Sequence, residues 1–217
     1  MHYLDIDEMI RRQIDLRNLY EPLWGPLHPE LGLNTLLWTY GEMGEVGDII
    51  TLDGDDAIMN DPKIRKHFVE EFCDVLMYLN DILICYNITS ADVTAKYHRR
   101  IGGGDNTVTL DIGEMLEHQK NLPREVPLKP EAGVRAALCA NNVMCRLNDN
   151  IKKMGHEAIL NDAVVRDDFV DAFCDVLMHL NDILVCYNIT PEEVTKEYRE
   201  KNDYNMVRWV DELPEKK

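Results

Sequence analysis

The most constraining feature of this sequence is an internal repeat. The segment FCDVLMYLNDILICYNIT at residues 72–89 returns almost unchanged as FCDVLMHLNDILVCYNIT at residues 173–190. The similarity extends upstream, where LDIDEMIRRQ from Leu4 is matched by LDIGEMLEHQ from Leu110. A repeat that spans nearly the whole chain indicates that one structural unit is used twice. The predicted organisation is a first copy at residues 1–100, a linker at 101–109 and a second copy at 110–217.

Both copies have the pattern of helices. Apolar residues recur at spacings of three and four through residues 36–50 and 68–85, and the alternation typical of strands is absent. After each NIT, Thr89 and Thr190 are followed three residues later by an acidic residue, which is a capping box and predicts a further helix in each copy. We therefore expect an all-α protein in which the tandem repeat forms one antiparallel helix bundle with pseudo-twofold symmetry.

The linker begins with the glycine-rich stretch IGGGDN at residues 101–106. Its composition predicts a flexible joint between the copies. A glycine loop that cradles phosphate is the weaker alternative.

Charge and hydropathy exclude several classes of protein. With 40 acidic and 23 basic residues, the 217-residue chain has a formal net charge of −17, which repels nucleic acid and anionic membranes. No stretch approaches the roughly 18 consecutive apolar residues of a membrane-spanning helix. The N-terminal MHYLDIDEMIRRQ lacks the basic and apolar regions of a signal peptide. We expect a cytoplasmic protein that binds neither nucleic acid nor membranes.

The cysteines have no CxxC spacing that would indicate zinc or redox chemistry, and most fall inside apolar helical stretches. We expect buried, reduced thiols at Cys73, Cys85, Cys139, Cys145, Cys174 and Cys186.

Two acidic pairs in the first copy stand out. Glu42 and Glu45 are three residues apart on one expected helix, and Glu71 and Asp74 are three apart on the next. Residues at this spacing share a helix face. Two facing helices would therefore place four carboxylates around one point, where hard oxygen ligands suit Mg²⁺ or Mn²⁺.

The second copy serves as an internal control for these acids. Three of them are replaced, in order, by Val143, Arg146 and Ala172, whereas Asp175 keeps the place of the fourth. The apolar framework is unchanged, so the fold does not require the acids. Neighbouring carboxylates cost free energy unless a cation compensates them, which favours a metal site in the first copy. Asp81 occurs in both copies, and a structural role is expected for it.

These motifs resemble those of the all-α nucleoside triphosphate pyrophosphohydrolases, the superfamily of MazG and the dimeric dUTPases, which carry ExxE and ExxD on adjacent helices. A second resemblance indicates the dimeric dUTPase and dCTP-dUTP pyrophosphatase branch, because KNDYNMVR at residues 201–208 fits its KNxxNxxR segment. The resemblance implies a homodimer and Mg²⁺-dependent hydrolysis, with Mn²⁺ as an alternative. The implied substrate is a pyrimidine deoxynucleoside triphosphate, cleaved to the monophosphate and pyrophosphate. dUTP is expected first, and dCTP or a broader range of deoxynucleotides is the alternative.

The resemblance also implies roles for individual residues. The implied metal ligands are Glu42, Glu45, Glu71 and Asp74, the phosphate contacts Lys201, Asn205 and Arg208, and the base contacts Gln13 and Asn18. Glu45 is expected to orient or deprotonate the attacking water as well. The simpler interpretation of the C-terminal cations is a solvated basic helix end. Because the two copies would contribute different parts of one site, truncation after residue 105 is expected to abolish activity.

One departure from the family weakens the expectation of a uracil pocket. Dimeric dUTPases often carry tryptophans shortly after ExxE, where this chain has IITLDGDDAIMN. Trp24 and Trp38 could stack on a base, but packing in the core is the expected fate of both. Two rival functions remain, a non-catalytic nucleotide-binding protein and a purely structural helical bundle.

Overall fold

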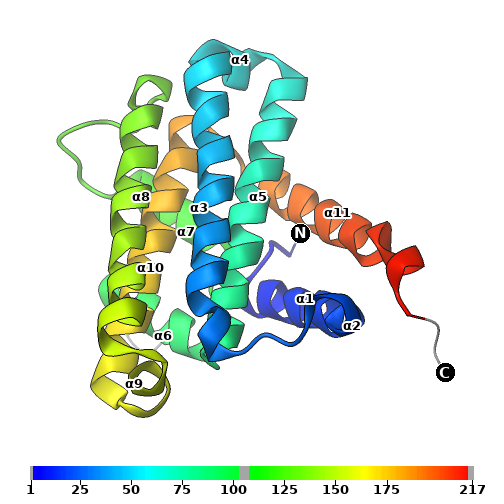
Figure 1. Ribbon diagram of the computed structural model, residues 1–217. Coiled ribbons are helices and arrows are strands. Elements are labelled where there is room, and N and C mark those ends of the chain that lie inside the picture. The colour runs from blue at the N-terminus through cyan, green and yellow to red at the C-terminus, as the bar shows by residue number, and fades with distance from the viewer. Residues whose placement is uncertain (1, 103–107, 215–217) are drawn as a thin grey trace.

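The computed structural model describes residues 2–102 and 108–214, and it confirms an all-α fold (Figure 1). These residues form no β-strand, and an isolated antiparallel bridge joins Asp5 to Asp111. Most of the predicted glycine joint lies outside the described residues. The α-helices are α1 (Ile6–Leu19), α2 (Glu21–Trp24), α3 (Gly32–Asp48), α4 (Asp55–Asn60), α5 (Pro62–Cys85), α6 (Ser90–Arg100), α7 (Ile112–Asn121), α8 (Gly133–Asp149), α9 (His156–Asn161), α10 (Ala163–Cys186) and α11 (Pro191–Arg208).

The predicted capping boxes are both present. The side chains of Thr89 and Thr190 accept a hydrogen bond from the backbone N–H three residues on, and the acidic side chain there accepts one from the threonine N–H. Just before these caps, Asn87 and Asn188 both have φ 51°, the left-handed region that asparagine tolerates better than most residues. The same local chemistry thus turns the chain at the same place in each copy.

Four long helices form the centre of the molecule. Figure 1 shows α3, α5, α8 and α10 upright beside one another, and α3 packs on α5 and on α8 while α8 packs on α10. Their facing sides bury aromatic and aliphatic residues completely, including Phe68, Phe72 and Phe169 at 0% exposure. Burial on this scale is the main stabilising term for the bundle.

The last helix of each copy packs on the other copy. Helix α6 lies against α10, and α11 lies against α5. The thiols of Cys73 and Cys174 point to corresponding backbone carbonyls across these contacts, at 3.9 and 3.7 Å. Arg65 of α5 likewise binds Glu193 of α11 and the carbonyl of Tyr187. Because α11 packs on α5, the C-terminal segment of the second copy lies beside a helix of the first copy.

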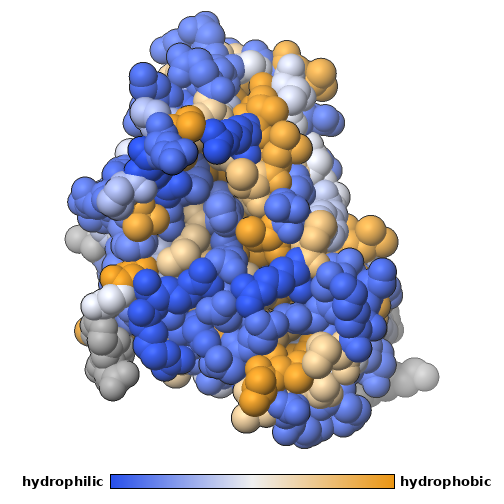
Figure 2. Space-filling model, turned by 90° about the vertical axis from the view of Figure 1, so that its left-hand side faces the viewer, coloured by the Kyte–Doolittle hydropathy of each residue, from blue (hydrophilic) through white to orange (hydrophobic). Residues whose placement is uncertain are grey.

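Two of the six cysteines are less buried than expected. Burial is confirmed for Cys73, Cys85, Cys174 and Cys186, but it is wrong for Cys145, which is exposed on α8, and Cys139 is half-buried. The side of the molecule on which α8 lies carries a strip of apolar surface (Figure 2). None of the helices in the described ranges is both long and apolar enough to cross a membrane.

Candidate functional site

Three of the four predicted acids come together where α3 and α5 face each other. One carboxylate oxygen from each of Glu42, Glu45 and Glu71 lies within 4.8 Å of the other two. We call these three residues the acidic cluster. Glu71 is buried, Glu42 is half-buried and Glu45 is exposed, so solvent reaches the cluster from the side of Glu45. His67, one turn before Glu71 on α5, lies with Nδ1 3.2 Å from its carboxylate.

The cluster opposes its own ionisation. Burial and the neighbouring charges of Asp74, Glu45 and Glu71 raise the pKa of Glu42 to about 7. Burial and the charges of Asp74 and Glu45 raise the pKa of Glu71 to about 7 as well. Carboxyls in such surroundings ionise readily only when a cation compensates their charge. The donor set therefore fits a divalent cation that prefers oxygen ligands, such as Mg²⁺ or Mn²⁺.

Asp74, the fourth predicted ligand, has a cationic partner of its own. The ammonium of Lys201 lies 2.7 Å from Asp74 and 2.9 Å from Glu70. Burial lowers the pKa of Lys201, but the hydrogen bonds to Asp74 and Glu70 outweigh this effect and raise that pKa above its ordinary value. Burial also raises the pKa of Asp74, against the opposing effect of Lys201. The four acids thus divide into a cluster of three and one that is bound to α11.

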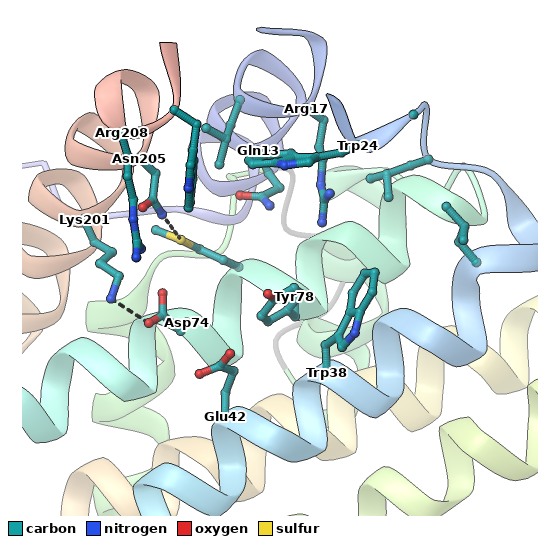
Figure 3. Close-up of a pocket in the computed structure, with 16 residues that line it drawn as sticks. Gln13, Arg17, Trp24, Trp38, Glu42, Asp74, Tyr78, Lys201, Asn205 and Arg208 are labelled. Atoms are coloured by element: carbon teal, nitrogen blue, oxygen red, sulfur yellow. Dashed lines mark hydrogen bonds and ion pairs between the residues drawn. The ribbon is translucent and has the colours of Figure 1, made fainter. Parts of the chain in front are cut away.

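A cavity of about 480 Å³ is lined by two of these acids, Glu42 and Asp74. Figure 3 shows Glu42 and Asp74 facing it from α3 and α5, and Lys201, Asn205 and Arg208 facing it from α11. The structure therefore brings the predicted phosphate contacts beside the predicted metal ligands. We call this cavity the aromatic pocket, after the side chains that form its walls.

Aromatic rings line the pocket on two sides. Trp38 of α3 and Tyr78 of α5 have ring centroids 5.8 Å apart, and Trp24 of α2 and Trp209 have centroids 5.2 Å apart. Figure 3 shows Trp24 across the cavity from Trp38. The expectation that Trp24 and Trp38 pack in the core is wrong, because they are 37% and 45% exposed and both line the pocket. Such rings provide surfaces on which a planar base can stack.

The predicted base contact Gln13 lies at the inner end of the pocket, held by a buried network. Its side-chain amide nitrogen donates to Asp81 at 2.9 Å, and Arg17 donates to the same carboxylate through Nε at 3.1 Å. Because a carboxylate only accepts, the amide orientation is set and Gln13 Oε1 is left without a partner among the described residues. Asn18 is exposed and does not line the pocket, whereas Arg17, which was not predicted, does.

Asn205 and Arg208 of the C-terminal segment also line the pocket. Asn205 is 8% exposed, and its Oδ1 has no partner among the described residues. The guanidinium of Arg208 lies over the Trp209 ring, 4.6 Å from its centroid. A cation held on an aromatic face at the mouth of a pocket is well placed to meet an anion.

The second copy fills the corresponding place with its own cations. Arg146, which replaces Glu45 in the repeat, binds Asp171 at 3.1 Å and Asp175 at 2.7 Å, and it also binds Asp168. Arg100 of α6 binds Asp171 and Asp175 as well. The negative charges of Asp171 and Asp175 in the second copy are therefore compensated by arginine and not by a metal ion.

The pocket of the second copy is smaller and differs in its walls. A cavity of about 300 Å³ is lined by Cys139 and His179, which hold the places of Trp38 and Tyr78 in the repeat. Comparison of the copies could have identified Tyr78, because it interrupts the nearly complete match between residues 72–89 and 173–190. Trp38 lies in a stretch where α3 and α8 differ at most positions. No such signal marks Trp209, which lies beyond the matched segments.

Similarity to other proteins does not identify this site. No family model matches the chain, and no curated protein or solved structure is significantly similar to it. What the site can do must therefore follow from the residues themselves.

Proposed function

We propose that this protein is a nucleoside triphosphate pyrophosphohydrolase that cleaves a pyrimidine deoxynucleoside triphosphate to the monophosphate and pyrophosphate. The observation that carries this proposal is that Glu42, a member of the acidic cluster, lines the aromatic pocket together with Asp74, Lys201 and Arg208. A base, a triphosphate and a divalent cation each meet suitable chemistry along this one cavity. The resemblance to the all-α pyrophosphohydrolases supports the same reaction.

The metal-binding part of the proposal rests on oxygen ligands. Glu42, Glu45 and Glu71 would hold Mg²⁺, and Asp74 would join them when its carboxylate is free. A bound Mg²⁺ would neutralise phosphate charge and lower the pKa of a bound water. This helps explain how a chain of net charge −17 could accept a polyanion.

The remaining steps fall to the chain itself. Glu45 is the most exposed member of the acidic cluster, and it would orient the attacking water and accept its proton. The water oxygen would attack the α-phosphorus, the bond from that phosphorus to the oxygen that bridges to the β-phosphate would break, and pyrophosphate would leave with that oxygen. Lys201 and Arg208 would hold the phosphate oxygens, with Asn205 between them as a hydrogen-bond partner.

The base would lie between the aromatic walls, with Gln13 at its edge. The free Oε1 of Gln13 accepts a hydrogen bond, which suits the N3–H of uracil and equally the N4 amino group of cytosine. The family resemblance puts dUTP first as the proposed substrate, and dCTP is the alternative that the same acceptor suits equally well. Discrimination between them depends on how the rest of the pocket edge is hydrogen-bonded.

A pyrophosphate-release assay tests the proposal directly. Purified protein with Mg²⁺ is given dUTP, dCTP, dTTP, dATP, dGTP and the corresponding ribonucleotides. Turnover of a pyrimidine deoxynucleotide is expected, and it should disappear with EDTA. Folded protein that releases pyrophosphate from none of them would overturn the proposal. Saturable binding of dUTP without turnover would favour the non-catalytic alternative.

The proposal extends to architecture and assembly. We propose that the two sequence copies form one antiparallel bundle related by a pseudo-twofold axis, which the equal lengths of α3 and α8 and of α5 and α10 support. We also propose a homodimer. The repeat-related residues Leu37 and Leu138 are 68% and 64% exposed, and exposed apolar side chains of this kind are suited to burial in an interface between two copies of the chain.

A further inference from the structure

The structure points to a lysine that controls how many metal ions the site holds. We propose that, without nucleotide, the protein binds one divalent cation at Glu42, Glu45 and Glu71, and that Lys201 keeps a second cation off Asp74. A substrate phosphate then draws Lys201 away and opens Asp74 to metal. This inference rests on the proposed function and adds an order of assembly to it.

The geometry separates Asp74 from the acidic cluster. One carboxylate oxygen from each of the three glutamates lies within 4.8 Å of the other two, and Asp74 does not belong to that set. Instead Asp74 accepts from Lys201 at 2.7 Å, and the same ammonium binds Glu70 at 2.9 Å. Lys201 is itself only 14% exposed, so this is a packed contact between α11 and α5. A divalent cation on Asp74 would have to displace the ammonium or lie against it, and like charges at that distance repel strongly.

Independent groups indicate that a ligand enters beside this contact. Gln13 and Asn205 are 3% and 8% exposed, and each leaves a side-chain oxygen without a partner among the described residues. Both line the pocket that Lys201 and Asp74 also line. Buried polar atoms without a partner are costly, and a ligand in this cavity would satisfy them. Lys201 is thus within the same cavity as the phosphates that it would bind.

The second copy shows that the contact forms where no acidic cluster exists. Arg100 holds the place of Lys201 in the repeat, and it binds Asp171 and Asp175, which hold the places of Glu70 and Asp74. In each copy, a basic residue on the last helix therefore forms ion pairs with two carboxylates on the long helix of the other copy. In the first copy this ion pair lies next to the acidic cluster, and both Lys201 and Asp74 line the aromatic pocket, where a ligand can compete for the lysine.

Mn²⁺ binding, followed by electron paramagnetic resonance, tests the inference with the metal alone. Wild-type protein without nucleotide should bind one Mn²⁺ per chain, and Lys201→Met should bind two. Asp74→Asn should keep the single Mn²⁺, whereas Glu71→Gln should bind it at least tenfold more weakly. Two ions on the wild type, one on Lys201→Met, or equal loss in Asp74→Asn and Glu71→Gln would each overturn the inference.

Two control variants separate this effect from simple loss of charge. Lys66→Met removes a lysine that lines the same surface hollow as Lys201 but binds Glu197, and it should stay at one Mn²⁺. Arg100→Met removes the corresponding ion pairs in the second copy and should also stay at one. A second ion on either variant would mean that net charge, and not the freeing of Asp74, sets the number. If Lys201→Met does not fold by circular dichroism, the contrast between Asp74→Asn and Glu71→Gln decides.

A nucleotide arm distinguishes failure of this inference from failure of the proposed function. Adding α,β-imido-dUTP to wild-type protein should raise bound Mn²⁺ above one per chain. If the analogue does not bind while Lys201→Met still takes two ions, the proposed substrate is wrong and the competition at Asp74 stands. If the analogue binds and the count stays at one, the phosphate does not release Lys201 and the inference fails.

Discussion

The guanidinium of Arg146 lies 2.7 Å from the carboxylate of Asp175. In the repeat these residues take the places of Glu45 and Asp74, so one helix pair carries a cation where the other carries an acid. The two copies differ in how the negative charge of their carboxylates is compensated. The second copy compensates its carboxylates with arginine, and the first leaves a cluster that a divalent cation fits. This contrast makes the second copy a control for experiments on the first.

Stability should therefore respond in opposite directions to matched substitutions. Arg146→Gln removes a cation from Asp168, Asp171 and Asp175, of which Arg100 still binds the last two. Because the network is partly exposed, we expect a loss of about 1–2 kcal/mol. Glu45→Gln removes one member of a mutually repelling cluster and should leave the free energy of unfolding unchanged or higher. Urea denaturation in EDTA measures both. A loss in Glu45→Gln as large as that in Arg146→Gln would contradict this account.

Activity should show the reverse pattern. Glu45→Gln removes the proposed proton acceptor, and Glu71→Ala removes a proposed metal ligand, so each should lower kcat by about 100-fold or more. Arg146→Gln should keep kcat close to that of the wild type when assayed well below its melting temperature. Pyrophosphate release at saturating Mg²⁺ gives the values. If the Arg146 variant is as inactive as the Glu45 variant, the assignment of the chemistry to the first copy is wrong.

The acidic cluster should also make stability fall as the pH rises. Glu42 and Glu71 have pKa values raised from 4.5 to about 7, mainly by burial. The folded chain holds these protons more tightly than the unfolded chain, so raising the pH from about 4.5 to 7 costs stability. The double variant Glu42→Gln/Glu71→Gln should match the wild type near pH 5 and exceed its melting temperature at pH 8.

Mg²⁺ provides the control for this pH dependence. A divalent cation binds the ionised carboxyls, so the stabilisation by Mg²⁺ should grow across the same pH window in the wild type and be absent in the double variant. The melting temperature of the wild type minus that of the double variant should fall from pH 5 to pH 8. If this difference stays constant, the raised pKa values are contradicted.

Base stacking should be measurable at Trp38. Stacking of one base on an aromatic side chain is worth about 1–3 kcal/mol, so Trp38→Ala should raise the KM for dUTP by about 5-fold to 150-fold with a smaller effect on kcat. Cys139→Ala changes the corresponding position of the second pocket and should leave both constants unchanged. If Trp38→Ala leaves the KM for dUTP unaltered, Trp38 does not stack on the base.

The parts of the site that were predictable are those set by local spacing. Acids three residues apart share a helix face whatever the tertiary structure, and the threonine caps depend on a hydrogen bond within four residues. Comparing Glu45 with Arg146 then needed only the alignment of the copies. These features could be predicted because their physical causes lie within one turn of helix or within the repeat.

The remaining features depend on which helix packs where. Nothing in the periodicity of α6 and α11 indicates that each crosses to the other copy. The family resemblance implied that Lys201 and Asp74 belong to one site, but their direct ion pair was not predicted. Trp24 and Trp38 were expected in the core because apolar rings usually lie there. They line the pocket instead, because segments distant in sequence meet around it. A residue's hydropathy indicates that it avoids water but does not identify the surface that covers it.

Glycines on α3 offer a last test of the packing. A Cβ on Gly32 would lie 2.2 Å from the hydroxyl oxygen of Tyr86. The Tyr86 side chain is fully buried, and its hydroxyl donates a hydrogen bond to the Pro29 carbonyl. Gly32→Ala must therefore displace Tyr86, and we expect a loss of about 1–3 kcal/mol. Gly41 lies on the exposed face of the same helix with no atom within 4 Å of an added Cβ, so Gly41→Ala should gain about 0.5–1 kcal/mol through helix propensity. Urea denaturation of the two variants should give shifts of opposite sign, and a Gly32→Ala protein as stable as the wild type would mean that Tyr86 does not pack against the start of α3.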